Sequence, residues 1–138
     1  MHVRRTLLLA PVALCCLAGC GPPKAQTPGH YTLKATAACL EKSGLKVAKN
    51  PPDLDFVASS APGGALRSRR DRKTFLIIFG NTQDDSKLVV KGYERAAPNA
   101  KARRRLHSLL DLEGNAVIYW YTEPDAAQAT DVRGCLRG

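Results

Sequence analysis

The stretch TFLIIF, Thr74–Phe79, constrains the fold of this chain more than any other part of its sequence. Its last four residues, Leu76–Phe79, form an unbroken apolar run, which is typical of a central strand that is buried on both faces. The stretch Ala65–Arg69 lies just upstream, across the short polar segment Arg70–Lys73. These two stretches therefore predict an antiparallel hairpin whose second strand lies inside a sheet.

A second hairpin is predicted nearer the C-terminus. Its strands are expected at Arg105–Leu112 and Ala116–Tyr121, on either side of the turn Glu113-Gly114-Asn115. In AVIYWY both sets of alternating side chains are apolar, so we expect both faces of this strand to pack against other elements. Short strands are also expected from Leu45 onward and at Leu54–Ser59.

Three stretches have the apolar spacing and the end signals of helices. The first spans about Leu33–Ser43, the second follows Thr82 and stops at Pro98, and the third begins near Pro124. Helices and hairpins in this order predict an α+β fold, a two-layer sandwich in which about three helices cover an antiparallel sheet. The inner face of the second helix is expected to contain Leu88, Val89 and Tyr93.

The start of the chain has the order of a secretory signal peptide. Two arginines, Arg4 and Arg5, precede an apolar run at Leu7–Leu17, and small residues follow at Ala18 and Gly19. The apolar run has roughly a dozen residues, whereas a helix that spans a membrane needs about 20. We therefore expect an export signal rather than a permanent transmembrane helix.

The end of this segment, Leu17-Ala18-Gly19-Cys20, resembles the lipobox of bacterial lipoproteins. The resemblance covers only the signal, and it implies that the chain is cut before Cys20 and that this cysteine carries more than one acyl chain. Each buried CH₂ group contributes about 0.8 kcal/mol, so several acyl chains together hold a protein at a membrane. The implied protein is exported and anchored to the cell membrane through Cys20, with ordinary cleavage and secretion as the alternative.

The lipobox divides the chain into three segments. Residues 1–19 are expected to be removed, residues 20–30 form a tether rich in proline and glycine, and residues 31–138 form a single domain. Removing the signal leaves 119 of the 138 residues, enough for one modest core. Cys39 and Cys135 each precede a leucine in a predicted helix, a pattern that resembles small uncharacterised bacterial lipoproteins and implies no activity.

The five cysteines predict one disulfide bond. Two of them lie in the signal and Cys20 is used by lipid, so only Cys39 and Cys135 remain. In an exported protein such a pair is expected to be oxidised, and a loop of this length contributes on the order of 4–5 kcal/mol. A reactive thiol, for example in a Cys39–His107 pair, and a metal site are the alternatives. Neither cysteine belongs to a CxxC pair, so no metal or cofactor is expected.

The mature chain is expected to be basic. Without Arg4 and Arg5, 19 of the 21 lysines and arginines remain against 12 acidic residues, a formal charge of +7. The excess cations can bind anionic envelope polymers or lipid headgroups, or they can simply keep the surface solvated. No aromatic residues interleave with them to stack bases, and with export this means that no nucleic-acid partner is expected. The first cluster is Arg67, Arg69, Arg70, Arg72 and Lys73, and the second is Lys101, Arg103, Arg104 and Arg105.

The sequence contains no catalytic motif of the GxSxG, Walker, HExxH or GxGxxG type. In FGNTQDDSK, Asp84 and Asp85 favour helix capping over a phosphate site, because their charge would repel an anion. We therefore expect a non-catalytic, lipid-anchored domain of the cell envelope with a structural or binding role. Two alternatives stay open: a surface binder of polyanions, and an enzyme whose polar groups, such as His107, Ser108 and Asp111, converge in a pocket.

Overall fold

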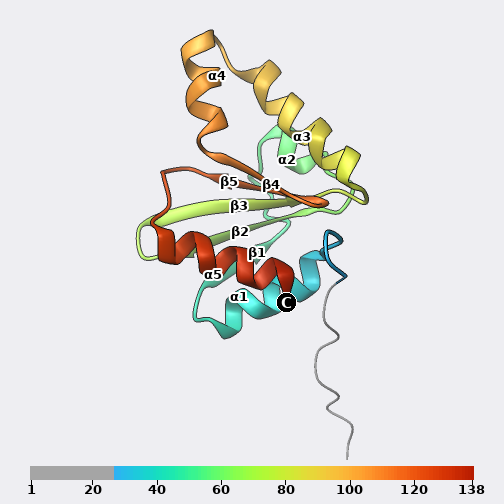
Figure 1. Cartoon of the computed structure of the whole chain (residues 1–138), viewed down its shortest axis with the longest axis vertical. Coiled ribbons are helices and arrows are strands. Elements are labelled where there is room, and N and C mark those ends of the chain that lie inside the picture. The colour runs from blue at the N-terminus through green and yellow to red at the C-terminus, as the bar shows by residue number, and fades with distance from the viewer. Residues whose placement is uncertain (1–26) are drawn as a thin grey trace, which may run out of the picture.

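A five-stranded antiparallel sheet forms the centre of the protein (Figure 1). The structure is a computed structural model, and it describes residues 27–138. The strands are β1 (Lys46–Lys49), β2 (Ala65–Arg70), β3 (Lys73–Phe79), β4 (Leu110–Glu113) and β5 (Ala116–Trp120). They lie in the order β1-β2-β3-β5-β4, so β3 occupies the middle of the sheet and pairs with β2 in the predicted hairpin.

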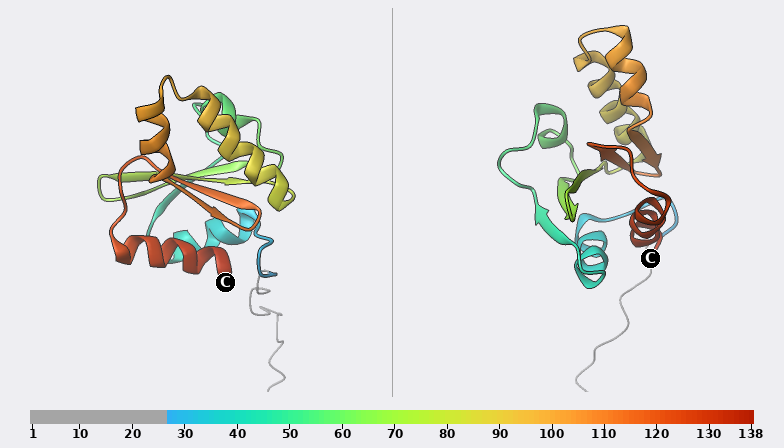
Figure 2. Two further views of the ribbon diagram at one scale, coloured as in Figure 1. Left: turned by 45° about the horizontal axis from the view of Figure 1, so that its top comes forward. Right: turned by 90° about the vertical axis from the view of Figure 1, so that its left-hand side faces the viewer.

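Helices cover both faces of this sheet (Figures 1 and 2). On one side, which we call the disulfide face, lie α1 (Leu33–Lys42) and α5 (Ala126–Arg137). On the other side, which we call the arm face, lie α2 (Phe56–Ser59) and α3 (Gln83–Ala96), and α4 (Ala100–His107) extends from α3. The α+β class with an antiparallel sheet is confirmed, but the structure has five helices instead of three and three layers instead of two.

The third layer follows from the alternation of side chains along β3. Phe75 and Ile77 pack in the core beneath α1 and α5, whereas Leu76 and Ile78 pack in a second core beneath α2 and α3. All four side chains are fully buried. A strand that is apolar on both faces needs a cover on each side, which a two-layer sandwich does not supply.

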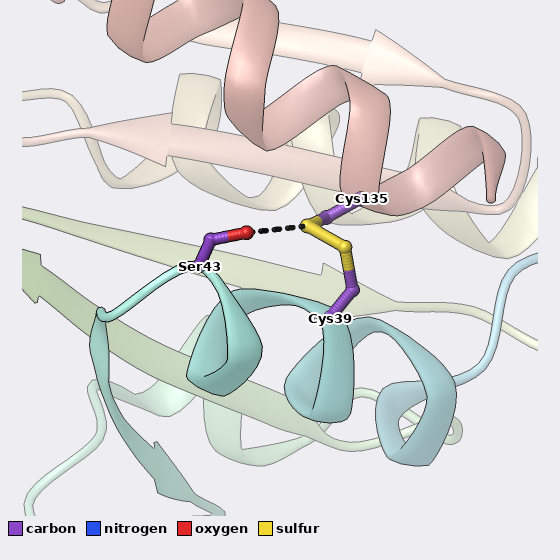
Figure 3. The surroundings of a disulfide bond; sticks show 3 residues. All are labelled: Cys39, Ser43 and Cys135. Carbon is purple, nitrogen blue, oxygen red and sulfur yellow. Dashed lines mark hydrogen bonds between the residues drawn. A yellow bond between two sulfur atoms is a disulfide. The ribbon is translucent and has the colours of Figure 1, made fainter.

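The disulfide face is closed by the predicted bond between Cys39 and Cys135, which joins α1 to α5 (Figure 3). The two Cα atoms are 5.4 Å apart, although the residues are separated by 96 positions in the sequence. Ser43, which ends α1, places its Oγ 3.9 Å from the Sγ of Cys135. Helices from distant parts of the chain are thereby held side by side over the same core.

The stretch Leu54–Ser59 does not form the strand that we predicted. Asp55 caps a single helical turn, α2, by accepting a hydrogen bond from the backbone N–H of Ala58 at 3.0 Å. Its carboxylate also accepts a hydrogen bond from the Tyr93 hydroxyl at 2.9 Å, which ties α2 to α3. The capping bond overrides the strand preference of LDFVAS.

The predicted strand Arg105–Leu112 is also wrong in its first half. Asn99 caps α4 by accepting a hydrogen bond from the backbone N–H of Ala102 at 2.9 Å, and the helix continues to His107. Alanine, lysine and arginine, which are strong helix formers, make up its first six residues. Strand β4 begins only at Leu110, so the second hairpin is shorter than expected.

Helix α3 begins directly after Thr82, as predicted, and Thr82 forms a capping box at its start. The Thr82 side chain accepts a hydrogen bond from Asp85 N at 3.2 Å, and the Asp85 carboxylate accepts one from Thr82 N at 2.9 Å. Val89 and Tyr93 are buried as expected, but Leu88 is 62% exposed. Each helical residue is rotated by about 100° from the one before it, so Leu88 is turned away from the stripe that contains Val89.

Residues 27–30, which we assigned to the tether, are bonded to the domain. The backbone oxygen of Gly29 accepts a hydrogen bond from Asn115 N at 3.0 Å. The buried Asn115 side chain bonds both the N–H and the carbonyl oxygen of Tyr31. The turn between β4 and β5 therefore fixes where the chain enters the domain, while the predicted signal, the lipobox and the lipid-bearing Cys20 lie outside the described residues.

Candidate functional site

The α3–α4 hairpin projects from the domain and carries a concentrated positive charge (Figures 1 and 2). Residues 91–107, which we call the basic arm, contain six lysines and arginines against one acidic residue, Glu94. Helix α4 has no buried residue. The second predicted basic cluster therefore lies on a solvated helix, which also includes Arg105, the expected first residue of a strand.

The cations of α4 lack carboxylate partners in the part of the chain that the structure describes. The backbone oxygen of Glu94 accepts a hydrogen bond from Arg103 Nε at 3.3 Å. No carboxylate between residues 27 and 138 lies within ion-pairing distance of Lys101, Arg104 or Arg105. Because these charges are not neutralised, the arm attracts anions over a Debye length of about 8–10 Å.

The first predicted basic cluster does not form one patch. Successive side chains of a strand point to opposite faces, so the members on β2 and β3 are divided between the two sides of the sheet. Arg70 pairs with Asp131 of α5 at 2.7 Å, and Lys73 pairs with Asp125, at the start of α5, at 2.9 Å. These two cations therefore lie on the disulfide face and form ion pairs there.

Arg67 and Arg69 project from the arm face. Arg67 Nη1 lies 2.7 Å from Asp53 Oδ2, and this hydrogen-bonded carboxylate raises the pKa of Arg67. Arg69 Nε donates a hydrogen bond to the backbone oxygen of Asp71 at 2.6 Å. Arg72 is exposed in the turn between β2 and β3. Only part of the first cluster therefore lies on the same side of the sheet as the basic arm.

A groove of about 390 Å³, which we call the tyrosine groove, lies between α3, α4 and the end of β5. Three rings form a continuous cluster in it: the centroids of Tyr93 and Tyr119 are 4.9 Å apart, and those of Tyr119 and Tyr121 are 5.2 Å apart. Tyr93 is buried, Tyr119 is half-buried and Tyr121 is 40% exposed, so the cluster runs from the core to the surface. The remaining lining consists of Ala96, Ala97, Pro98, Ala102, Arg105, Leu106 and Leu109.

A cation from the second predicted cluster, Arg105, lines this groove from α4. Burial raises the pKa of the Tyr121 hydroxyl, and the positive charge of Arg67 opposes this shift. Arg67, from the first cluster, therefore acts on the exposed tyrosine, although it is not among the residues that line the groove.

The inner end of the groove is held by Tyr93. Its hydroxyl donates a hydrogen bond to Asp55 Oδ2 at 2.9 Å. Burial, with the adjacent Asp55 carboxylate, raises the pKa of Tyr93, so the phenol stays protonated and keeps donating at neutral pH. This bond fixes the ring against which Tyr119 packs.

The sequence pattern by itself did not indicate this tyrosine cluster. No aromatic residues interleave with the basic clusters in the sequence, but in three dimensions Arg105 and three tyrosines line one groove. The i, i+2 spacing of Tyr119 and Tyr121 in a predicted strand places both on one face, which was the available signal. The approach of Tyr93 depends on how α3 packs against β5, which no local pattern predicts.

The polar residues suggested for a catalytic pocket do not converge. His107 Nε2 lies 3.3 Å from a carboxylate oxygen of α3. Ser108 Oγ donates a hydrogen bond to the backbone oxygen of Arg105 at 2.8 Å. Asp111 points toward the disulfide face, where its carboxylate accepts a hydrogen bond from Arg133 of α5 at 2.7 Å. The three side chains therefore have three separate partners.

Other sites weighed from the sequence are occupied by structural bonds. Cys39 is held in the disulfide and offers no thiol for a pair with His107. At the start of α3 the Asp85 carboxylate accepts hydrogen bonds from Asn81 N at 3.0 Å and Thr82 N at 2.9 Å, so helix capping is confirmed there. In the described part of the chain, no group of three or more His, Cys, Asp or Glu side chains is placed to hold a metal ion.

Every helix between residues 27 and 138 falls short of the length or the hydrophobicity that a membrane crossing requires. Comparisons with protein-family models, with curated proteins and with solved structures give no match for this chain.

Proposed function

We propose that this protein is a lipid-anchored lipoprotein of the cell envelope whose domain binds an anionic polymer and catalyses no reaction. The lipobox residues Leu17–Cys20 support export and anchoring. The Cys39–Cys135 disulfide supports an oxidising compartment, because such bonds are rare in reducing ones. The observation that carries the binding role is the basic arm, whose helix α4 projects its cations into solvent.

The position of the arm favours a polymer over the headgroups of the anchoring membrane. Tyr31, where the chain enters the domain, packs in the core of the disulfide face, and the arm lies on the other side of the sheet (Figure 1). Helix α3 has 14 residues, which corresponds to a length of about 21 Å. Attraction to headgroups fades within a Debye length of about 8 Å at physiological salt. A domain tethered from its disulfide face therefore presents the arm to partners away from that membrane.

Replacing Cys20 tests the anchor. Cys20→Ala removes the thiol that the lipobox would lipidate, so we expect the protein to move from the membrane fraction to the soluble fraction. Cys16→Ala, within the predicted signal, is the matched control and should leave the protein in the membrane fraction. Retention of Cys20→Ala protein in membranes would contradict the anchor.

Binding to defined anionic polymers tests the role of the arm. We expect the domain to bind polygalacturonate and long-chain polyphosphate with an affinity that falls steeply with salt, because bound counterions are released. Lys101→Gln/Arg104→Gln should weaken binding to both polymers and flatten the salt dependence. Lys34→Gln/Lys42→Gln removes the same charge from α1, on the disulfide face, and should have a much smaller effect.

Vesicles that contain phosphatidylglycerol separate a polymer partner from a lipid partner. Weaker binding to these vesicles than to the polymers would support the proposal. Tighter binding to the vesicles than to either polymer would overturn it in favour of headgroup binding. Equal weakening by the α4 variant and the α1 variant would show that net charge, and not the basic arm, controls binding.

A further inference from the structure

We propose that the tyrosine groove recognises one repeating unit of the bound polymer, and that this unit is an acidic sugar. The inference rests on the proposed polymer-binding role and names the chemistry of the polymer. A sugar ring presents an apolar face of C–H groups, and an acidic sugar adds one carboxylate. The groove has a complementary group for each of these two features.

The aromatic part of the groove suits the face of a sugar ring. Tyr121 is 40% exposed and is supported from below by Tyr119, whose ring meets it edge-on at an interplanar angle of 82°. Tyr119 in turn packs against Tyr93, which is fixed by its bond to Asp55. The exposed ring is therefore held in place before a ligand arrives, which lowers the entropy lost on binding. The volume of about 390 Å³ lies within the range of about 300–1,000 Å³ typical of small-ligand sites.

Arg105 is the cation best placed to bind the carboxylate. It lines the groove and has no carboxylate partner between residues 27 and 138. An arginine can donate two parallel hydrogen bonds to one carboxylate. Arg67 does not line the groove and is already paired with Asp53 at 2.7 Å, so it is less available to a ligand than Arg105. Among the described residues that line the groove, Arg105 is therefore the one cation, which matches one acidic group per unit.

The residues that line the tyrosine groove favour an acidic sugar over other anions. Polyphosphate has no ring, so the tyrosines add nothing to its affinity, which depends on the charge of the basic arm alone. Single-stranded nucleic acid combines rings with charge, but it favours grooves in which basic residues follow a continuous backbone. Apart from Arg105, the residues that line the tyrosine groove are apolar or tyrosine. The groove is therefore better matched to a ring with one charge than to a nucleotide chain.

Titration calorimetry with short oligomers tests the inference on the full domain. The probes are trigalacturonate, the neutral trisaccharide maltotriose, inorganic tripolyphosphate and a short oligothymidylate. We expect Tyr121→Leu and Arg105→Gln each to weaken trigalacturonate binding about tenfold. The matched control Lys42→Gln, which removes one positive charge from α1 on the disulfide face, should weaken it no more than twofold. Tyr121→Leu should leave tripolyphosphate binding unchanged, and maltotriose should bind more weakly than trigalacturonate.

Three results would overturn parts of this scheme and can be told apart. If Tyr121→Leu leaves trigalacturonate binding unchanged while polyphosphate still responds to Arg104→Gln, the sugar subsite is wrong and the polymer-binding role stands. If oligothymidylate binds tighter than trigalacturonate and depends on Tyr121, the groove recognises bases instead of sugars. If neither trigalacturonate nor polyphosphate binds, the proposed function itself fails. Thermal unfolding of each variant verifies that the exposed substitutions leave the fold intact.

Discussion

The two faces of the sheet use charge and apolar side chains differently. On the disulfide face, 15 buried residues form one core, and cations such as Arg70 and Lys73 are paired with carboxylates of α5 and its N-cap. On the arm face the core has seven buried residues, and the described chain provides no carboxylate within ion-pairing distance of Arg104 or Arg105. The disulfide face therefore has the larger core, and the arm face contains the unpaired arginines of α4.

The difference has a physical cause. A cation that is already paired must lose its partner before it binds a new anion, whereas an unpaired cation exchanges only water and counterions. On the arm face, α3, α4 and the end of β5 leave the tyrosine groove between them. Stability and recognition are therefore easier to combine when they are assigned to opposite faces.

Removing the disulfide should produce the largest effect, on the face that it closes. Cys39→Ala/Cys135→Ala releases a constraint on the unfolded chain, so we expect the free energy of unfolding to fall by about 4–5 kcal/mol. Denaturant titration followed by circular dichroism measures this loss. Reduction of the unmodified protein should lower the free energy of unfolding by a similar amount. If the loss is below about 1 kcal/mol both in the double variant and in the reduced protein, the disulfide face does not depend on the disulfide bond.

A matched pair of leucines compares the packing of the two faces. Leu66 and Leu76 lie on neighbouring strands, and both are fully buried, but they face opposite cores. Either alanine substitution should lower the free energy of unfolding by about 2–5 kcal/mol. We expect the larger loss for Leu66→Ala, because helices tied by a disulfide cannot close the cavity. Denaturant titration of both variants measures these losses. A larger loss for Leu76→Ala than for Leu66→Ala would contradict the expected difference between the two cores.

A matched pair of arginines compares how charge is used. Arg133 lies 2.7 Å from the Asp111 carboxylate, which also accepts a hydrogen bond from Trp120 Nε1. We expect Arg133→Gln to lower the free energy of unfolding by about 1 kcal/mol, and Arg104→Gln to change it by less than about 0.5 kcal/mol. Thermal unfolding of the two variants measures the difference, and equal losses would show that the ion pair of Arg133 adds no stability.

The smallest expected effect is a pH dependence at the start of α5. The bond from Gln128 N and the nearby Lys73 ammonium hold the pKa of Asp125 below its usual value near 3.8. A lowered pKa in the folded state gives stability that is present above the unfolded value and is lost as the pH falls through the folded value. Asp125→Asn keeps an N-cap but removes the charge, so it should be less stable than the parent at pH 7, and this difference should shrink as the pH falls from 7 toward 2. A stability difference that stays constant over this range, in urea titrations, would show that the charge is irrelevant.

Elements whose signals lie within a few residues could be predicted from the sequence. TFLIIF predicted the central strand because its side chains are apolar on both faces. Thr82 and Asp85 predicted the start of α3 because capping is a local bond. The pairing of Cys39 with Cys135 followed from counting cysteines. By contrast, α2 and α4 were missed because the caps at Asp55 and Asn99 compete with plausible strand patterns, and apolar composition alone does not show which wins.

The candidate site was predictable only in its separate parts. The basic residues were visible in the sequence, but alternation along β2 and β3 divides the first cluster between two faces. The tyrosine groove brings Tyr93 of α3 to Tyr119 of β5, and this meeting depends on packing between elements. No pattern within either segment contains that information.

The sequence by itself determined the α+β class, the antiparallel hairpin around TFLIIF and the disulfide partners. Hydrophobic alternation is a local pattern, and only two cysteines were left to pair with each other. Only the tertiary structure decided that helices cover both faces, and that Arg105 of α4 and Tyr121 line one groove. The physical reason is that these contacts join residues on different elements. Their distances depend on how α3 and α4 pack over the sheet, so the groove exists only once the whole domain has folded.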